Sequence, residues 1–71
     1  MTNTELLAEA ISRSGLKKGY IAERLGVSRT GLNNLINNRA EFRASQMVAL
    51  AELLGLTVEE KNAIFFAQRG V

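Results

Sequence analysis

Apolar residues recur along this chain at helical spacing, in five stretches separated by short polar or glycine-containing breaks. Apolar side chains three or four positions apart lie on one face of a helix, which is typical of a helix packed against a core. The chain has no proline and no alternating β-branched run that would indicate a strand. We therefore predict an all-α fold with helices over about residues 3–14, 17–25, 28–37, 44–54 and 58–68.

Capping residues and glycines mark the predicted helix ends. Thr2 with Glu5, and Thr57 with Glu60, have the spacing of a capping box, in which each side chain bonds the other residue's backbone N–H. Three glycines follow predicted helices, where the left-handed conformation is least costly for glycine: Gly15, Gly26 and Gly55. Asn38 is expected to adopt this conformation after the third helix.

Residues 17–37 have the pattern of two short helices that meet across a tight turn. Ile21, Ala22 and Leu25 share one face of the first helix, and the small Ala22 allows a second helix to approach closely. Gly26 ends this helix and Ser28 is a suitable N-cap for the next. The apolar side chains of the second helix then face back toward the first: Leu32, Leu35 and Ile36. This pattern predicts a helix-turn-helix, and hence double-stranded DNA as the partner.

The outward face of the second helix of this motif carries polar side chains suited to base edges. In the major groove, arginine pairs well with guanine and asparagine with adenine. The predicted base-contacting residues are therefore Arg29, Thr30, Asn33 and Asn34. The alternative is a solvated polar face without a ligand.

Charge strengthens the DNA prediction through its distribution. The net charge is only +2, but residues 13–43 hold seven basic and two acidic residues, whereas the flanking segments sum to −3. A positive field concentrated at the motif attracts phosphate groups in a salt-sensitive way.

Composition excludes several other classes of protein. The chain has no cysteine and no histidine, so it cannot form disulfides, Cys/His zinc sites or Ser-His-Asp triads. A chain of 71 residues suits one domain over residues 1–71 and leaves little room for a catalytic cleft. No apolar run reaches the length of a membrane span, and the first residues lack the basic start of a signal peptide. We expect a cytoplasmic protein that is not an enzyme and needs no cofactor, metal or small-molecule ligand.

The motif resembles the Cro/CI-type (XRE-like) helix-turn-helix family of phage repressors and small bacterial transcriptional regulators. The resemblance covers roughly residues 4–58. It rests on Ile21 to Thr30, on Asn37-Asn38-Arg39, and on Met47, Leu50-Ala51 and Leu54 to Thr57. It implies a compact five-helix, lambda-repressor-like domain with the motif at the second and third helices.

The resemblance also implies roles for residues around the motif. Ser28, just after the turn, joins the predicted base-contacting set. The predicted phosphate contacts lie around the second helix of the motif, which we call the recognition helix: Lys17, Lys18, Asn37, Asn38, Arg39 and Arg43. Family members often have glutamine where this chain has Lys18, and a lysine gives a stronger but less directional phosphate contact. Lys17 and Lys18 are alternatively a merely solvated pair, and Asn38 is alternatively only a helix cap.

The fifth helix raises the question of a protein partner. Ile64, Phe65 and Phe66 are adjacent, and successive helical residues point about 100° apart, so one face cannot bury all three. By analogy with the family we predict a homodimer interface here, at least on DNA, with operator half-sites about one helical turn apart. The alternative is a monomer with both phenylalanine rings in its core.

Two further readings stay open. One is an antitoxin that binds a toxin through its C-terminal helix and regulates its own synthesis, and the other is a helical protein-interaction module.

Gly19 and Gly31 lie inside predicted helices, where glycine costs about 1 kcal/mol. For Gly31 we weigh close approach of DNA or of the neighbouring helix against a tolerated weak position, and for Gly19 we favour the weak position.

Overall fold

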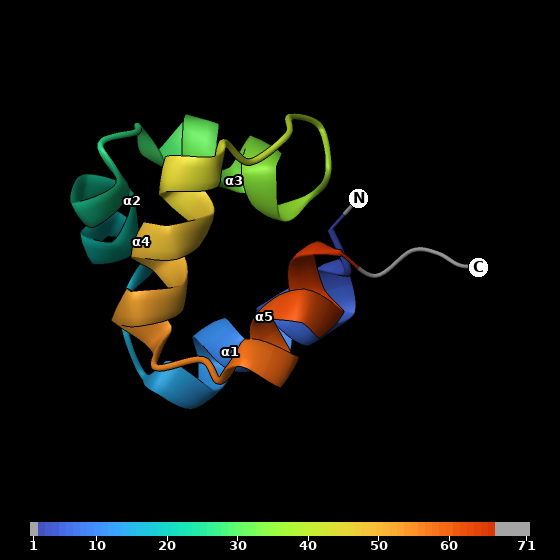
Figure 1. Cartoon of the computed structure of the whole chain (residues 1–71). Helices are drawn as coiled ribbons and strands as arrows, with labels where there is room; N and C mark the ends of the chain where they lie inside the picture. The colour runs from blue at the N-terminus through green and yellow to red at the C-terminus, as the bar shows by residue number, and fades with distance from the viewer. Residues whose placement is uncertain (1, 67–71) are drawn as a thin grey trace.

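The computed structural model describes residues 2–66. Within this range it contains five α-helices and no strand: α1 (Thr4–Ser14), α2 (Lys18–Leu25), α3 (Arg29–Ile36), α4 (Ala44–Leu54) and α5 (Val58–Phe65). Figure 1 shows α4 running between the α2–α3 pair at one end of the molecule and the α1–α5 pair at the other. The all-α prediction is confirmed, and each predicted helix start lies within one residue of the observed one.

The core is apolar and draws on all five helices. Four large side chains are almost completely inaccessible: Leu7, Ile21, Leu32 and Leu50. Ala22, in the middle of α2, is also buried and lets the neighbouring helices approach. No polar or charged side chain of residues 2–66 is buried. The hydrophobic effect is therefore the main stabilising contribution to this fold.

Phe42 is a core residue that the helical pattern did not predict. It lies in the loop between α3 and α4, yet only 7% of it is exposed. Its ring meets that of Phe65 edge to face, with centroids 5.1 Å apart and planes at 72°. Edge-to-face pairs of this kind are favourable beyond their buried area. The loop after α3 is thus attached to α5 through two aromatic rings.

One of the two predicted capping boxes is wrong and the other is confirmed. At α1 the N-cap is Asn3, whose Oδ1 accepts a hydrogen bond of 3.0 Å from Leu6 N–H, and not Thr2. At α5, Thr57 N–H donates to Glu60 Oε1 over 2.9 Å, and Glu60 N–H donates to Thr57 Oγ1 over 3.1 Å. Asn3 thus takes the capping position one residue after Thr2, and asparagine is at least as good an N-cap as threonine.

Thr2 is bonded to the turn that follows α3. Asn38 Nδ2 donates to the Thr2 carbonyl over 2.7 Å, and Thr2 N–H donates to Asn38 Oδ1 over 3.3 Å. The next residue, Asn3, donates its N–H to the Ile64 carbonyl over 2.7 Å. Residues 2 and 3 therefore connect the turn after α3 to the last turn of α5.

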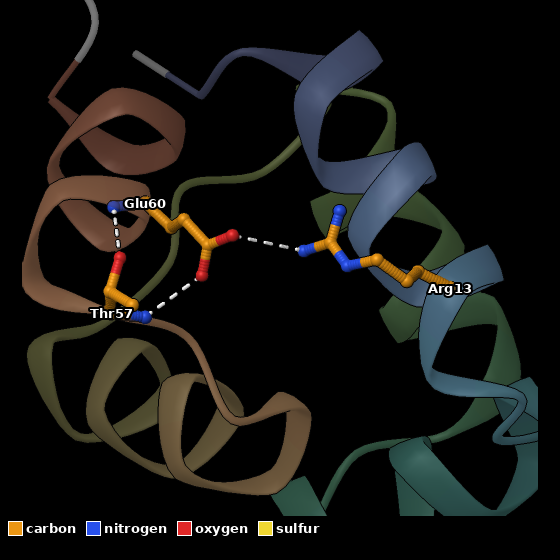
Figure 2. A network of polar contacts seen from close by, with 3 residues as sticks. All are labelled: Arg13, Thr57 and Glu60. Atoms are coloured by element: carbon orange, nitrogen blue, oxygen red, sulfur yellow. Dashed lines mark hydrogen bonds and ion pairs between the residues drawn. The ribbon is translucent and has the colours of Figure 1, made fainter.

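Glu60 also joins α5 to α1 across the surface. Its Oε2 lies 3.3 Å from Arg13 Nη2, while its other carboxylate oxygen serves the cap of Thr57, as Figure 2 shows. Both side chains are substantially exposed, at 58% for Arg13 and 42% for Glu60. Exposed pairs of this kind contribute about 0–1 kcal/mol, so this contact adds little to the stability of the fold.

The end of α5 differs from the prediction in two respects. The helix ends at Phe65, because Phe66 has already left helical geometry with φ −125° and ψ 36°. Residues 67 and 68 of the predicted helix lie outside the described residues. Ile64 and Phe65 are each only 3% exposed, whereas Phe66 is 60% exposed. This burial removes Ile64 and Phe65 from the predicted dimer surface, because the core of the same chain covers them, and leaves Phe66.

Candidate nucleic-acid interface

The turn between α2 and α3 is fixed by backbone hydrogen bonds. Gly26 has φ 75°, its N–H donates to the Glu23 carbonyl over 3.1 Å, and Val27 N–H donates to the Ala22 carbonyl over 3.0 Å. These two bonds form a Schellman motif, which satisfies carbonyls that the end of a helix would otherwise leave unpaired. The predicted cap at Gly26 is confirmed, and the direction in which the chain leaves α2 follows from it.

Ser28 starts the recognition helix. Its Oγ accepts a hydrogen bond of 2.9 Å from Gly31 N–H, which confirms the predicted N-cap. A Cβ at Gly31 would lie 3.3 Å from that Oγ and 3.5 Å from Val27 Cβ. The close neighbours of Gly31 are therefore the cap and the turn, which indicates why a small residue suits this position. Because the hydroxyl oxygen accepts this bond, the hydroxyl hydrogen of Ser28 is not used by the cap.

Replacement of Ser28 by alanine is expected to lower the free energy of unfolding by about 1 kcal/mol, because the cap of α3 is lost. Thermal unfolding followed by circular dichroism measures this change. Ser28→Asp is the matched control, since aspartate caps helices equally well, and it should retain wild-type stability. Equal losses from both variants would contradict the capping role.

The face of α3 that points away from the core is polar and accessible. Arg29, Thr30 and Asn33 are all exposed, while Leu32, Leu35 and Ile36 are buried on the opposite side. Asn33 lies one turn beyond Arg29 and Thr30, so the three share one face. The structure thus presents together three of the four residues predicted from the helix pattern.

Asn34 lies on the flank of α3, where it is half-buried. It lines an open polar groove between α3 and the start of α4, together with Gly31, Arg43 and Ser45. Sequence reasoning did not select Ser45. The position of Ser45 could have indicated it, because Ser45 lies in the first turn of the helix predicted over residues 44–54, two residues after Arg43.

The two predicted groups of phosphate-contacting residues lie at the ends of the motif. Lys17 and Lys18 are exposed and begin α2, where no side chain caps the first backbone N–H groups. Such groups favour anions. Arg39 and Arg43 are exposed in the loop after α3, and the N–H of Arg43 donates to Gln46 Oε1 over 2.8 Å at the start of α4.

The two asparagines after α3 already have partners within the protein. Asn37 Nδ2 donates to the Asn33 carbonyl over 2.9 Å. Asn38 has φ 61°, which confirms the predicted left-handed conformation, and both polar atoms of its side chain bond Thr2. Asn38 thus holds the N-terminal segment, and its contact with phosphate stays a prediction.

The basic side chains near the motif are not neutralised by neighbouring acids. Among residues 2–66, the ion pair between Arg13 and Glu60 is the only one within 4.0 Å. Arg13 belongs to the basic segment in the sequence, but this contact directs it toward α5. Within residues 2–66, such a partner is absent from Arg29, which begins α3, and from the cations on either side of this helix: Lys17, Lys18, Arg39 and Arg43.

Two α-helices joined by a Schellman turn, with a capped second helix that presents a polar face, define a helix-turn-helix domain. A sequence model of the family described as Helix-turn-helix matches residues 6–61, from α1 into α5. The chain belongs to this family, in its Cro/CI or XRE-like branch, and is a DNA-binding transcription regulator of that type. No curated protein and no solved structure matched the chain.

Other kinds of site find little support in the described residues. Residues 2–66 contain no group of three or more acidic side chains, histidines or cysteines positioned to hold a metal ion. None of their helices is long and apolar enough to cross a membrane. The family is one of DNA-binding regulators and is not enzymatic.

Proposed function

We propose that this protein is a transcriptional repressor that binds operator DNA as a dimer, with α3 of each subunit in the major groove. The observation that supports this most strongly is the joint exposure of Arg29, Thr30 and Asn33 on one face of α3. The buried face of α3 and its capped start fix the helix that carries these side chains before DNA arrives. A preorganised helix has less backbone entropy to lose on binding.

Base reading and phosphate binding have separate residues in this proposal. Arg29 donates two hydrogen bonds to a guanine, Asn33 or Asn34 pairs with an adenine, and Thr30 and the hydroxyl of Ser28 complete the contacts. Lys17 and Lys18 on one side and Arg39 and Arg43 on the other hold the backbone and set the register. Asn37 and Ser45 add hydrogen bonds to phosphate oxygens on the side of Arg39 and Arg43.

Dimerisation follows from the small size of the reading surface. One recognition helix reads only a few base pairs, so two subunits on half-sites about one helical turn apart give the necessary specificity. Of the three residues predicted for the dimer interface, Phe66 at the end of α5 has exposed surface available for a second copy. The biological setting that we propose is the cytoplasm of a bacterium carrying a prophage or related mobile element, where the dimer covers an operator that overlaps a promoter.

An antitoxin-type autoregulator is the second candidate. It is favoured by the exposed Phe66 and by an open, largely apolar groove between α1 and α5, lined in part by Leu6, Ala10 and Ala63. Both lie outside the reading face of α3, so a toxin bound there would leave that face accessible. Copurification of a defined toxin encoded beside this protein would favour this candidate over the repressor.

Selection of bound sequences from a random duplex pool tests the proposed function. We expect enrichment of a twofold-symmetric site that binds about 10³-fold or more tightly than a scrambled duplex at the same salt concentration. Weak, steeply salt-dependent binding without any enriched sequence would contradict a sequence-specific regulator. Analytical ultracentrifugation of the complex with the selected duplex then gives the number of subunits bound.

Replacement of Arg29 by alanine is expected to weaken binding of the selected duplex by about 1–3 kcal/mol and to relax the preference at one base pair. Fluorescence anisotropy with duplexes altered at each position measures both effects. Lys18→Ala is the control, because loss of a phosphate contact weakens all duplexes equally and lowers the salt slope by about one. An unchanged base preference in the Arg29 variant would refute the proposed contact.

A further inference from the structure

The loop between α3 and α4, residues 37–43, carries two of the proposed phosphate contacts, and each directly follows an anchored residue. Arg39 follows Asn38, whose side chain is bonded to the start of the chain. Arg43 follows Phe42, whose ring is buried. Both arginines are exposed and have no acidic partner within 4.0 Å among the described residues. The positions of these two cations therefore depend on the residues just before them.

The ring of Phe42 holds the second half of the loop. Among the described residues, no hydrogen bond involves Glu41 or Phe42. Phe42 is only 7% exposed, and its ring meets that of Phe65 with centroids 5.1 Å apart. Closely packed side chains have little freedom to move, so the ring fixes the backbone that leads to Arg43. Arg43 is held from the other side by α4, because its N–H donates to Gln46 Oε1 over 2.8 Å.

The first half of the loop is attached through Asn38. Its side chain donates to the Thr2 carbonyl over 2.7 Å and accepts from Thr2 N–H over 3.3 Å. Asn3 then donates its N–H to the Ile64 carbonyl over 2.7 Å. Figure 1 shows the start of the chain beside the end of α5. Because Ile64 and Phe65 are consecutive, both attachments of the loop lead to the last turn of α5.

The last turn of α5 thus supports the loop from inside the domain. Ile64 and Phe65 are each only 3% exposed, so neither is available to contact DNA. A loop that is already ordered loses less backbone entropy when its cations bind phosphate. Contacts that order the loop therefore favour DNA binding, although they are not contacts with DNA.

We propose that the last turn of α5 orders this loop for phosphate binding. In this arrangement Phe42 is a positioning residue for Arg43, and Asn38 has the same role for the arginine that follows it. The inference rests on the proposed function, since it concerns the proposed phosphate contacts. Both residues act on the affinity and its salt dependence, and neither affects which base pairs are preferred.

Phe42→Leu tests the second half of the loop with the selected duplex. We expect binding to weaken about 3- to 10-fold, less than the loss of a whole charged hydrogen bond, and the salt slope to fall by up to about one. The base preference should not change. Leu54→Ala is the matched control, because Leu54 packs half-buried on the core at the other end of α4 and its truncation also lowers stability.

Both variants are compared at a temperature where circular dichroism shows them folded. The Leu54 control should then bind the duplex with the affinity and salt slope of the wild type. If it weakened binding as much as Phe42→Leu does, the effect would come from a general loosening of the fold and the proposal would be wrong.

An Arg43→Ala background shows whether Phe42 acts through this arginine. In that background Phe42→Leu should weaken binding further by less than about 2-fold, because mutations that act through one contact are not additive. The same loss in both backgrounds would contradict a positioning role.

Asn38→Gly tests the first half of the loop in the same way. Glycine keeps the left-handed backbone conformation but lacks the side chain that bonds Thr2. We expect a weakening of about 3- to 10-fold that disappears in an Arg39→Ala background. A direct contact of Asn38 with phosphate would instead weaken binding equally in both backgrounds, and would refute its positioning role.

The result for Arg43→Ala separates this inference from the proposed function. If the wild type enriches a site and Arg43→Ala lowers the affinity and the salt slope, wild-type binding by Phe42→Leu overturns this inference alone. A wild type that enriches no site overturns the proposed function as well.

Discussion

Phe42→Ala is expected to lower the free energy of unfolding by about 3–5 kcal/mol, the range for removal of a buried aromatic side chain. The ring is 7% exposed and meets Phe65 edge to face, so its removal leaves a cavity between the loop and α5. A domain of 71 residues has a total stability of only about 4–10 kcal/mol. Denaturant titration followed by circular dichroism should show a large decrease in midpoint.

Two controls make this test specific. Phe42→Leu should lose about 1–2 kcal/mol, because the space stays largely filled while the aromatic pair, worth about 0.5–1.5 kcal/mol, is lost. Phe66→Ala removes the same side chain from an exposed position and should change stability by less than about 0.5 kcal/mol. Equal stability of the Phe42→Ala and Phe66→Ala variants would contradict the assignment of Phe42 to the core.

Asn38→Ala is expected to lower the free energy of unfolding by about 2–5 kcal/mol. Alanine at φ 61° carries a penalty of about 1–2 kcal/mol, because its Cβ crowds the following carbonyl oxygen. The two hydrogen bonds to Thr2 are lost as well, at about 0.5–1.5 kcal/mol each. Thermal and chemical unfolding both measure the sum.

Asn38→Gly divides this sum into its two causes. Glycine adopts the left-handed conformation freely, so this variant loses only the two bonds to Thr2, and we expect a decrease of about 1–3 kcal/mol. If the glycine variant were as unstable as the alanine variant, backbone strain would have no part in the effect. If it matched the wild type, the bonds to Thr2 would contribute nothing to stability.

Local rules explain why the helices were predictable from the sequence. Apolar spacing placed Leu7, Ile21, Leu32 and Leu50 on inward faces, and each is almost completely buried. The turn at Gly26 and the cap at Ser28 depend only on residues within a few positions of themselves. Interactions of this range depend only on residues close together in the sequence. The helix starts could therefore be predicted to within one residue.

Long-range contacts explain what the sequence did not reveal. Phe42 is buried because Phe65, far along the chain, lies beside it, and no periodicity marks an isolated loop residue as core. Thr2 seemed to be a cap because residues 2 and 5 have the correct spacing, but Asn38 binds it from 36 positions away.

The turn between α2 and α3 also bears on how new operator preferences can arise. Its geometry comes from the backbone of Ala22 to Val27 and from the cap at Ser28, while the packing of α3 comes from its inward leucines and isoleucine. Arg29, Thr30 and Asn33 take part in neither. Exchange of these three side chains should therefore leave the scaffold intact. Under the proposed function, one stable framework can then be adapted to a series of different DNA sequences.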